Sequence, residues 1–188
     1  MPRASRRFVR TVAFGLLALG WDAGSRAASE PVPEKLVMSA LVYNIAKLTE
    51  WPQDAFSGPE APVTLCLLRD GNTYQGILEP IAGKPVVQGR PLEIRADSRL
   101  SQLAPCQLLY LDEADEPRLF AVLKALQGQP VLTVGNFDGF AEAGGMISLF
   151  VENEQMRLRI NQEAALAGRL HISSQLLRMG QIVKGGTP

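Results

Sequence analysis

The middle of the chain alternates short apolar segments suited to β-strands with amphipathic segments suited to helices, and this alternation constrains the fold most. Val63–Leu68, Gln107–Leu111 and Val131–Val134 are largely apolar runs of strand length. Leu92–Ala96 alternates apolar with polar residues, as an edge or half-covered strand does, and Glu116–Gln127 has the period of an amphipathic helix. Strands that alternate with helices in this way predict an α/β fold with parallel strand pairing.

The segments on either side extend this pattern without a linker or an internal repeat. Glu34–Glu50 has no Gly or Pro and is helical in pattern. We expect four apolar side chains to form its inward face: Val37, Leu41, Ile45 and Leu48. Most of this helix should be covered, by its own sheet or by another chain, since few of its residues are polar. Met146–Val151 and Met156–Ile160 are extended runs that predict an antiparallel hairpin.

The N-terminus is typical of a secretory signal peptide. Several arginines precede Thr11–Gly20, an apolar run that is far shorter than the ~20 residues of a membrane-spanning helix. Small residues at Ser25 and Ala27 suit a cleavage site. We therefore expect residues 1–27 to be removed near Ala27, leaving one domain over residues 28–188. An uncleaved anchor or a buried helix are the alternatives.

The charge of the mature chain argues against nucleic-acid binding. The whole chain has 19 Lys and Arg against 19 Asp and Glu. Removing residues 1–27 takes away five Arg and one Asp, which leaves a net charge of about −4. A mildly acidic chain without a basic stripe offers no surface that would release counterions from nucleic acid.

The two cysteines, Cys66 and Cys106, suit an exported protein. An even number in an oxidising compartment predicts a disulfide, which would close a loop of about 41 residues and stabilise the fold by roughly 4 kcal/mol. Two buried free thiols are the alternative. No metal site is expected, because the single histidine, His171, is far from both cysteines in sequence.

The glycine-rich stretch from Gly135 to Gly145 raises the question of phosphate binding. Its glycines lack the Gly-x-Gly-x-x-Gly spacing, and a strand-like segment rather than a helix follows them. No Gly-Lys-Ser or Gly-Lys-Thr occurs in the chain. We expect the loop to be structural, with Gly144 and Gly145 allowing a tight turn into the next strand.

Catalytic patterns are equally scarce, and no cofactor is expected. A Ser–His–Asp set would have to use His171, and no Gly-x-Ser-x-Gly elbow accompanies it. His171 is interpreted as a structural or rim residue, with contact to a ligand or partner as the alternative. Four acidic residues crowd one segment: Asp112, Glu113, Asp115 and Glu116. They favour a solvated helix start over a cation site.

Three segments together resemble the YfiR-like family of periplasmic proteins. Leu41–Pro52 resembles its N-terminal signature, an aromatic–Asn helix that ends in Trp-Pro. Val131–Leu149 resembles the central signature, and Arg157–Leu177 the C-terminal one. The order is the same, and the match spans nearly all of the mature chain.

The resemblance implies a sheet of about six strands flanked by helices in a protein that is often a dimer. It implies that Cys66 and Cys106 correspond to the family's first cysteine pair, whereas a second pair near the glycine loop is absent here. It also implies a periplasmic repressor that binds the sensor region of a membrane-bound diguanylate cyclase. Release of that partner would raise cyclic-di-GMP and favour biofilm formation.

On this basis six residues are predicted to lie on or beside a partner or ligand surface: Tyr43, Asn44, Trp51, Phe140, Met146 and His171. Asn44 and Asn161 could instead hydrogen-bond buried backbone. A sensor kinase is a second kind of partner. The competing function is a small-ligand module, for an amino acid, nucleotide or vitamin, with its site near His171. An enzyme is the least favoured function.

Overall fold

The computed structural model describes residues 34–68, 76–96, 99–103 and 105–186. The predicted signal peptide, residues 1–27, lies outside the described residues. Within them, no helix is both long enough and apolar enough to span a membrane.

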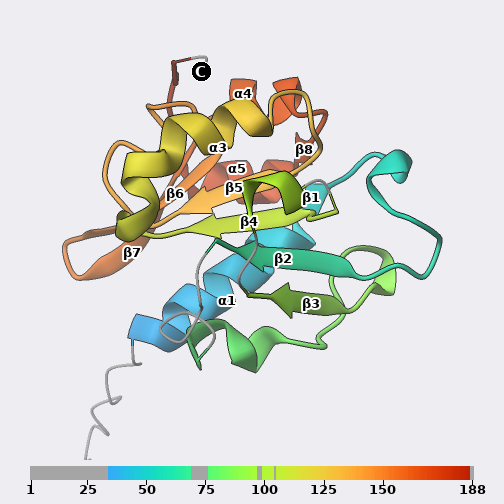
Figure 1. Ribbon diagram of the computed structural model, residues 1–188. Coiled ribbons are helices and arrows are strands. Elements are labelled where there is room, and N and C mark those ends of the chain that lie inside the picture. Colours follow the sequence, from blue (N-terminus) through green and yellow to red (C-terminus); the bar gives the residue numbers. More distant parts are fainter. Residues whose placement is uncertain (1–33, 69–75, 97–98, 104, 187–188) are drawn as a thin grey trace, which may run out of the picture. The chain divides into compact units, whose positions relative to one another are not determined.

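The fold is built on a seven-stranded sheet with the order β3-β2-β4-β5-β6-β7-β9 (Figure 1). Its strands are β2 (Val63–Leu67), β3 (Leu92–Arg95), β4 (Leu108–Leu111), β5 (Leu132–Gly135), β6 (Ile147–Glu152), β7 (Gln155–Ile160) and β9 (Gln181–Ile182). In this order, each strand from β3 through β2, β4 and β5 to β6 is parallel to the next one. Strands β6 and β7 form an antiparallel hairpin, and β9 is parallel to β7. The predicted α/β domain, its parallel pairing and its C-terminal hairpin are confirmed. The two-residue β9 is too short to leave a sequence pattern.

The central strands β2, β4 and β5 are buried along their whole length. Since successive side chains of a strand point to opposite faces, the sheet is covered on both sides there. In β2, Leu65 packs into the cluster that contains the helices α1, α4 and α5, while Cys66 packs into the cluster with α3. Leu108 and Leu109 of β4 divide in the same way. The α-helices are α1 (Glu34–Lys47), α3 (Leu119–Ala125), α4 (Gln162–Ala167) and α5 (Ser174–Met179). Strands covered on both sides read as continuous apolar runs, which explains the pattern in the sequence.

Short 3₁₀ helices and a second, two-stranded sheet complete the described structure. The 3₁₀ helices are η1 (Gln53–Ala55), η2 (Glu79–Ile81), η3 (Val87–Gly89), η4 (Leu100–Gln102) and η5 (Glu113–Arg118). The small sheet pairs β1 (Thr49–Glu50) with β8 (His171–Ile172) in antiparallel orientation. The amphipathic segment at 116–127 is thus a 3₁₀ helix that leads into the shorter α3.

The predicted inward face of α1 only partly coincides with the buried one: Ile45 is buried, and Leu41 and Leu48 are partly buried and pack against the core. The buried positions of this helix include Met38, Val42 and Ile45, whereas Val37 and Leu41 are only partly buried. The buried face is therefore rotated by about one residue, or ~100°, from the predicted one. Both faces of this helix are apolar, so the packing against the sheet decides between them. The helix also ends at Lys47 rather than at residue 50, because the next residues form β1.

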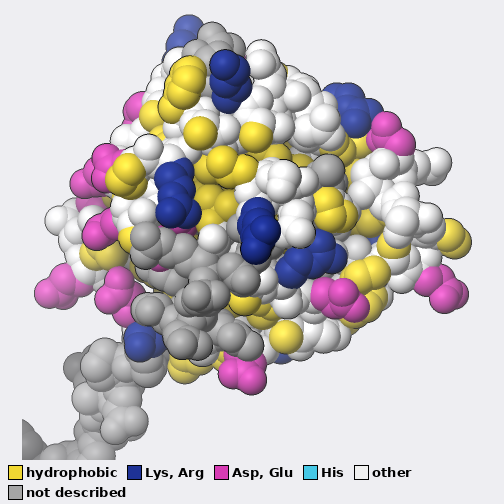
Figure 2. All heavy atoms as spheres, in the orientation of Figure 1, with side chains coloured by type: hydrophobic (Ala, Val, Ile, Leu, Met, Phe, Trp, Pro, Cys, Tyr) yellow, Lys and Arg dark blue, Asp and Glu magenta, His cyan; other side chains and the backbone are white. Residues whose placement is uncertain are grey.

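Hydrophobic side chains also reach the surface. Among the described residues the large exposed ones are Leu36, Leu100, Phe120, Val151, Leu166, Met179 and Ile182, on seven different elements. On the face shown in Figure 2, apolar side chains gather near the middle with Lys and Arg side chains among them, while Asp and Glu lie mainly towards the margins.

Candidate partner-binding surface

The pairing of β1 with β8 brings the N-terminal and C-terminal signature segments side by side. Glu50 lies opposite His171, and Thr49 lies opposite Ile172. The amide of Ser173 donates to the carbonyl of Leu48 at 2.9 Å, which extends the pairing by one bond. Residues that are far apart in sequence therefore share one surface.

Four exposed, polar side chains form this surface, which we name the β1–β8 surface: Glu50, Asp54, Arg169 and His171. Nη1 of Arg169 donates to Oδ2 of Asp54 at 2.7 Å, between residues 115 apart in sequence. His171 is exposed in β8, two residues beyond this arginine. The surface combines both signs of charge with a titratable imidazole, which suits selective recognition more than tight apolar binding.

The backbone at Arg169 is unusual for its residue type. Its φ is 60°, in the left-handed region that glycine normally occupies after a helix. The amide of Arg169 donates to Leu166 and that of Leu170 to Ala165, both at 2.9 Å, which forms the Schellman motif that ends α4. A non-glycine residue costs about 1 kcal/mol in this conformation. The geometry nevertheless directs a long cationic side chain at Asp54.

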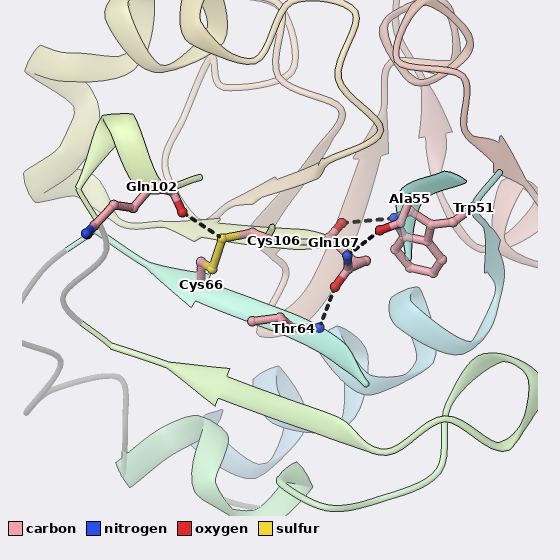
Figure 3. Close-up of a disulfide and its surroundings, with 7 residues drawn as sticks. All are labelled: Trp51, Ala55, Thr64, Cys66, Gln102, Cys106 and Gln107. Carbon is pink, nitrogen blue, oxygen red and sulfur yellow. Dashed lines mark hydrogen bonds between the residues drawn. A yellow bond between two sulfur atoms is a disulfide. The ribbon is translucent and has the colours of Figure 1, made fainter. Parts of the chain in front are cut away.

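Trp51 lies beneath this surface and anchors it to the sheet. It is 9 % exposed, and its indole N–H donates to the carbonyl of Gln107 at 3.0 Å. The side chain of Gln107 accepts from the amide of Thr64 at 2.8 Å and donates to the carbonyl of Ala55 at 2.7 Å (Figure 3). Trp51 thus has a structural role, and Gln107 is a supporting residue that the sequence reasoning missed. A polar residue at the start of an apolar strand was the available signal.

Tyr43 and Asn44 are half-buried on α1. The hydroxyl of Tyr43 donates to the carbonyl of Pro85 at 2.8 Å, and the ammonium groups of Lys47 and Lys84 lie 5.5 and 5.7 Å from its ring centroid. Asn44 accepts from the amide of Leu48 through its backbone oxygen. The structure therefore does not group Tyr43 with His171.

Phe140 and Met146 belong to the interior. Phe140 is 0 % exposed and forms an edge-to-face pair with Phe137, with centroids 5.2 Å apart. A Cβ placed on Gly145 would overlap the Phe140 ring, so this glycine makes room for the aromatic side chain. Met146 is buried and its amide donates to Oγ1 of Thr133 at 3.0 Å. Phe140 therefore cannot lie on a surface in this conformation, contrary to the sequence prediction.

The glycine loop is structural, as predicted. Gly144 has φ of 108°, which permits the turn into β6. Asn161 supports the same loop: its amide nitrogen donates to the carbonyl of Ala141 at 3.1 Å, and its oxygen accepts from the amide of Ala164 at 3.0 Å. The alternative in which Asn161 hydrogen-bonds buried backbone is therefore confirmed.

Cys66 and Cys106 form a disulfide, as predicted, with their Cα atoms 5.9 Å apart. Both residues are buried, at 0 % and 1 % exposure. The bond joins β2 to the segment just before β4 on the α3 side of the sheet (Figure 3). A disulfide fits an oxidising compartment.

The acidic segment after β4 is a helix start. Asp112 and Asp115 form a capping box at the beginning of η5, in which the amide of Asp112 donates to Oδ2 of Asp115 at 3.2 Å. Asp115 is buried, so the segment is less solvated than expected. Within the described part of the chain, no group of three or more His, Cys, Asp or Glu side chains could hold a metal ion.

Comparison with protein families supports the grouping of these segments. A family model described as YfiR/HmsC-like matches residues 36–181, which include all three signature segments and both cysteines. A search of curated proteins finds no match.

Proposed function

The chain belongs to the YfiR/HmsC-like family, and from this premise we propose that it represses an inner-membrane diguanylate cyclase by binding its periplasmic region. Residues 1–27 would direct export and be cleaved near Ala27. The match over residues 36–181 is the observation that carries the proposal. A membrane-bound sensor kinase is the second partner class, and a homodimer is part of the same expectation.

Repression of this kind requires no bond-breaking chemistry. A regulator that binds the inactive conformation of its partner more tightly than the active one shifts the population towards the inactive state. A hundredfold difference in affinity corresponds to about 2.7 kcal/mol. A few charged contacts and one apolar contact can supply that difference.

We propose the β1–β8 surface as the part that contacts the partner. Its support is threefold: it joins two of the family's signature segments, its side chains are exposed, and Trp51 and Gln107 hold it on the rigid sheet. Arg169 adds a further argument, since its strained backbone directs a cation to the surface.

Arg169→Gly tests this assignment without a large effect on folding. Glycine relieves the left-handed strain, which offsets the loss of an exposed ion pair worth about 0–1 kcal/mol. Stability should therefore change by less than about 1 kcal/mol. Co-purification with the partner should fall at least about tenfold if the arginine contributes a charged contact in the interface.

The matched control is Arg95→Ala, which removes an exposed arginine from β3 at the far end of the sheet order. Cyclic-di-GMP should rise in cells that carry Arg169→Gly and stay at the wild-type level in the control. Normal co-purification of Arg169→Gly would refute the surface, and unchanged cyclic-di-GMP after deletion of the whole gene would refute the function. The ligand site near His171 stays a separate prediction, which thermal-shift screening with amino acids, nucleotides and vitamins would test.

A further inference from the structure

A pocket of about 140 Å³ lies between the end of α3 and α4, and it shares no lining residue with the β1–β8 surface. Leu123 of α3 and Leu126, the residue that follows this helix, form one wall, and Ala164 and Ala167 of α4 form another. Met146, the residue just before β6, also lines the pocket. The lining is therefore mostly apolar, which favours a ligand with a hydrocarbon body.

The size of the pocket restricts that body to a single ring or a short chain. An engineered apolar cavity of about 150 Å³ holds one benzene molecule. The pocket here has a similar volume and is partly open to solvent, and its lining includes the exposed side chains of Gln127 and Glu163. A polar group of the ligand can thus reach the mouth while its body stays between the helices.

The polar atoms of the pocket include hydrogen-bond acceptors and one negative charge. Glu163 is the one charged residue among the fourteen that line it, all of them in the described part of the chain. Asn161 is 1 % exposed, and its side-chain oxygen accepts one bond, from Ala164, which leaves a second lone pair. The single charged residue of the lining is negative, which favours a cationic ligand over an anion.

The C-terminal segment forms the remaining wall. Its position is fixed by the amide of Val183, which donates to Ile160 at 3.0 Å, and by that of Gly186, which donates to Glu142 at 2.8 Å. A Cβ on Gly185 would overlap the Asn161 side chain and the carbonyl oxygen of Ala141. Only glycine lets the backbone close the pocket here without filling it.

We propose that this pocket binds a small amine with an apolar body, an arylalkyl or alkyl ammonium. The ammonium lies at the mouth beside Glu163, and the hydrocarbon body lies between α3 and α4 against Met146. The site is independent of the proposed regulatory function, and its lining includes Met146 but not His171 among the six residues predicted for a partner or ligand surface. It requires only the geometry of the α3–α4 pocket.

Benzylamine is the probe, with benzyl alcohol as its neutral analogue and benzoate as its anionic analogue. Titration of the mature, oxidised protein at pH 7, followed by amide chemical shifts, should place the perturbed residues around Leu126, Ala164 and Gly186. Benzylamine should bind about two- to fivefold more tightly than benzyl alcohol, the ratio expected of one partly exposed ion pair. Benzoate should bind more weakly than either.

Two variants separate the charge from the cavity. Glu163→Gln should lower the affinity for benzylamine about two- to fivefold and leave that for benzyl alcohol unchanged. Ala167→Leu should fill the pocket and abolish the binding of both. Its fold is checked by the thermal melt, and Ala121→Leu, an exposed α3 position outside the pocket, is the matched control.

Equal affinity for benzylamine and benzoate would overturn the proposal, as would shifts elsewhere in the protein. Benzylamine binding that survives Ala167→Leu would also overturn it. The absence of any saturable shift at millimolar benzylamine would show that the pocket takes no ligand of this class.

Discussion

The buried disulfide between Cys66 and Cys106 should contribute a large share of the stability of this domain. The bond closes a loop with a sequence separation of 40. In the chain-entropy model, a loop of this length restricts the unfolded chain by about 4 kcal/mol. Replacing both cysteines with alanine also removes two buried sulfur atoms, which adds about 1 kcal/mol for the small cavity left behind.

The double variant Cys66→Ala/Cys106→Ala should therefore unfold with a free energy about 4–6 kcal/mol lower than that of the oxidised wild type. For a domain of this size the melting temperature should fall by about 8–24 °C. Urea unfolding of both proteins is the assay. The variant should show a larger denaturant slope, since its unfolded chain is no longer compacted by a cross-link.

Reduced wild-type protein is the matched control, because it loses the cross-link but keeps both sulfur atoms. Its free energy of unfolding should lie between that of the oxidised wild type and that of the double variant. Since both residues are at most 1 % exposed, reductant without denaturant should act only through opening of the fold and therefore slowly. If the double variant loses less than about 1 kcal/mol of unfolding free energy, this reasoning is refuted. The unfolded chain would then keep the ends of the loop close together without the disulfide.

Three further substitutions test contacts described above, each measured by urea unfolding. Gln107→Leu should cost about 2–4 kcal/mol, because it leaves a buried amide and a buried carbonyl without their partners; a cost under 1 kcal/mol would mean that water replaces them. Gly145→Ala should lower the free energy of unfolding by about 2–3 kcal/mol, because the new Cβ overlaps the Phe140 ring. Adding Phe140→Leu to this variant should restore part of that stability. If the losses of the two substitutions simply add, the overlap is contradicted. Asn161→Ala should lower the free energy of unfolding by about 2–3 kcal/mol, since it removes both a helix cap and the hydrogen bond to the glycine loop. A loss smaller than that expected for the helix cap alone would show that the bond to the loop contributes nothing.

Much of the fold could be predicted from the sequence because the relevant signals are local. Strands such as Val63–Leu67 are buried on both faces, so they appear as continuous apolar runs. The hairpin is equally local: Asn153 and Glu154 have φ of 50° and 61°, which suits a two-residue turn between β6 and β7. The buried face of helix α1 was predicted only in part, because Met38 and Val37 are both apolar and hydrophobicity alone does not distinguish them.

The candidate site was harder to predict, since residues of one signature segment can serve different purposes. Trp51 and Phe140 stand in such segments yet are buried, whereas His171 is exposed. A motif shows which residues accompany one another along the chain, and it does not show which of them face the solvent. Asp54 gave no signal as a member of a site, because its partner Arg169 is far away in sequence. The polar Gln107 stood out at the start of an apolar strand, but the backbone groups that it binds could not be predicted from the sequence.

The sequence by itself determined the class of fold, the disulfide pairing and the absence of a phosphate-binding glycine motif, because each depends on residue type and spacing. Tertiary structure alone decided which face of α1 is buried and that Glu50 lies opposite His171. It also placed Arg169 against Asp54, 115 residues away. Contacts of that range form only when the whole chain packs, so their energies depend on neighbours that no local pattern contains.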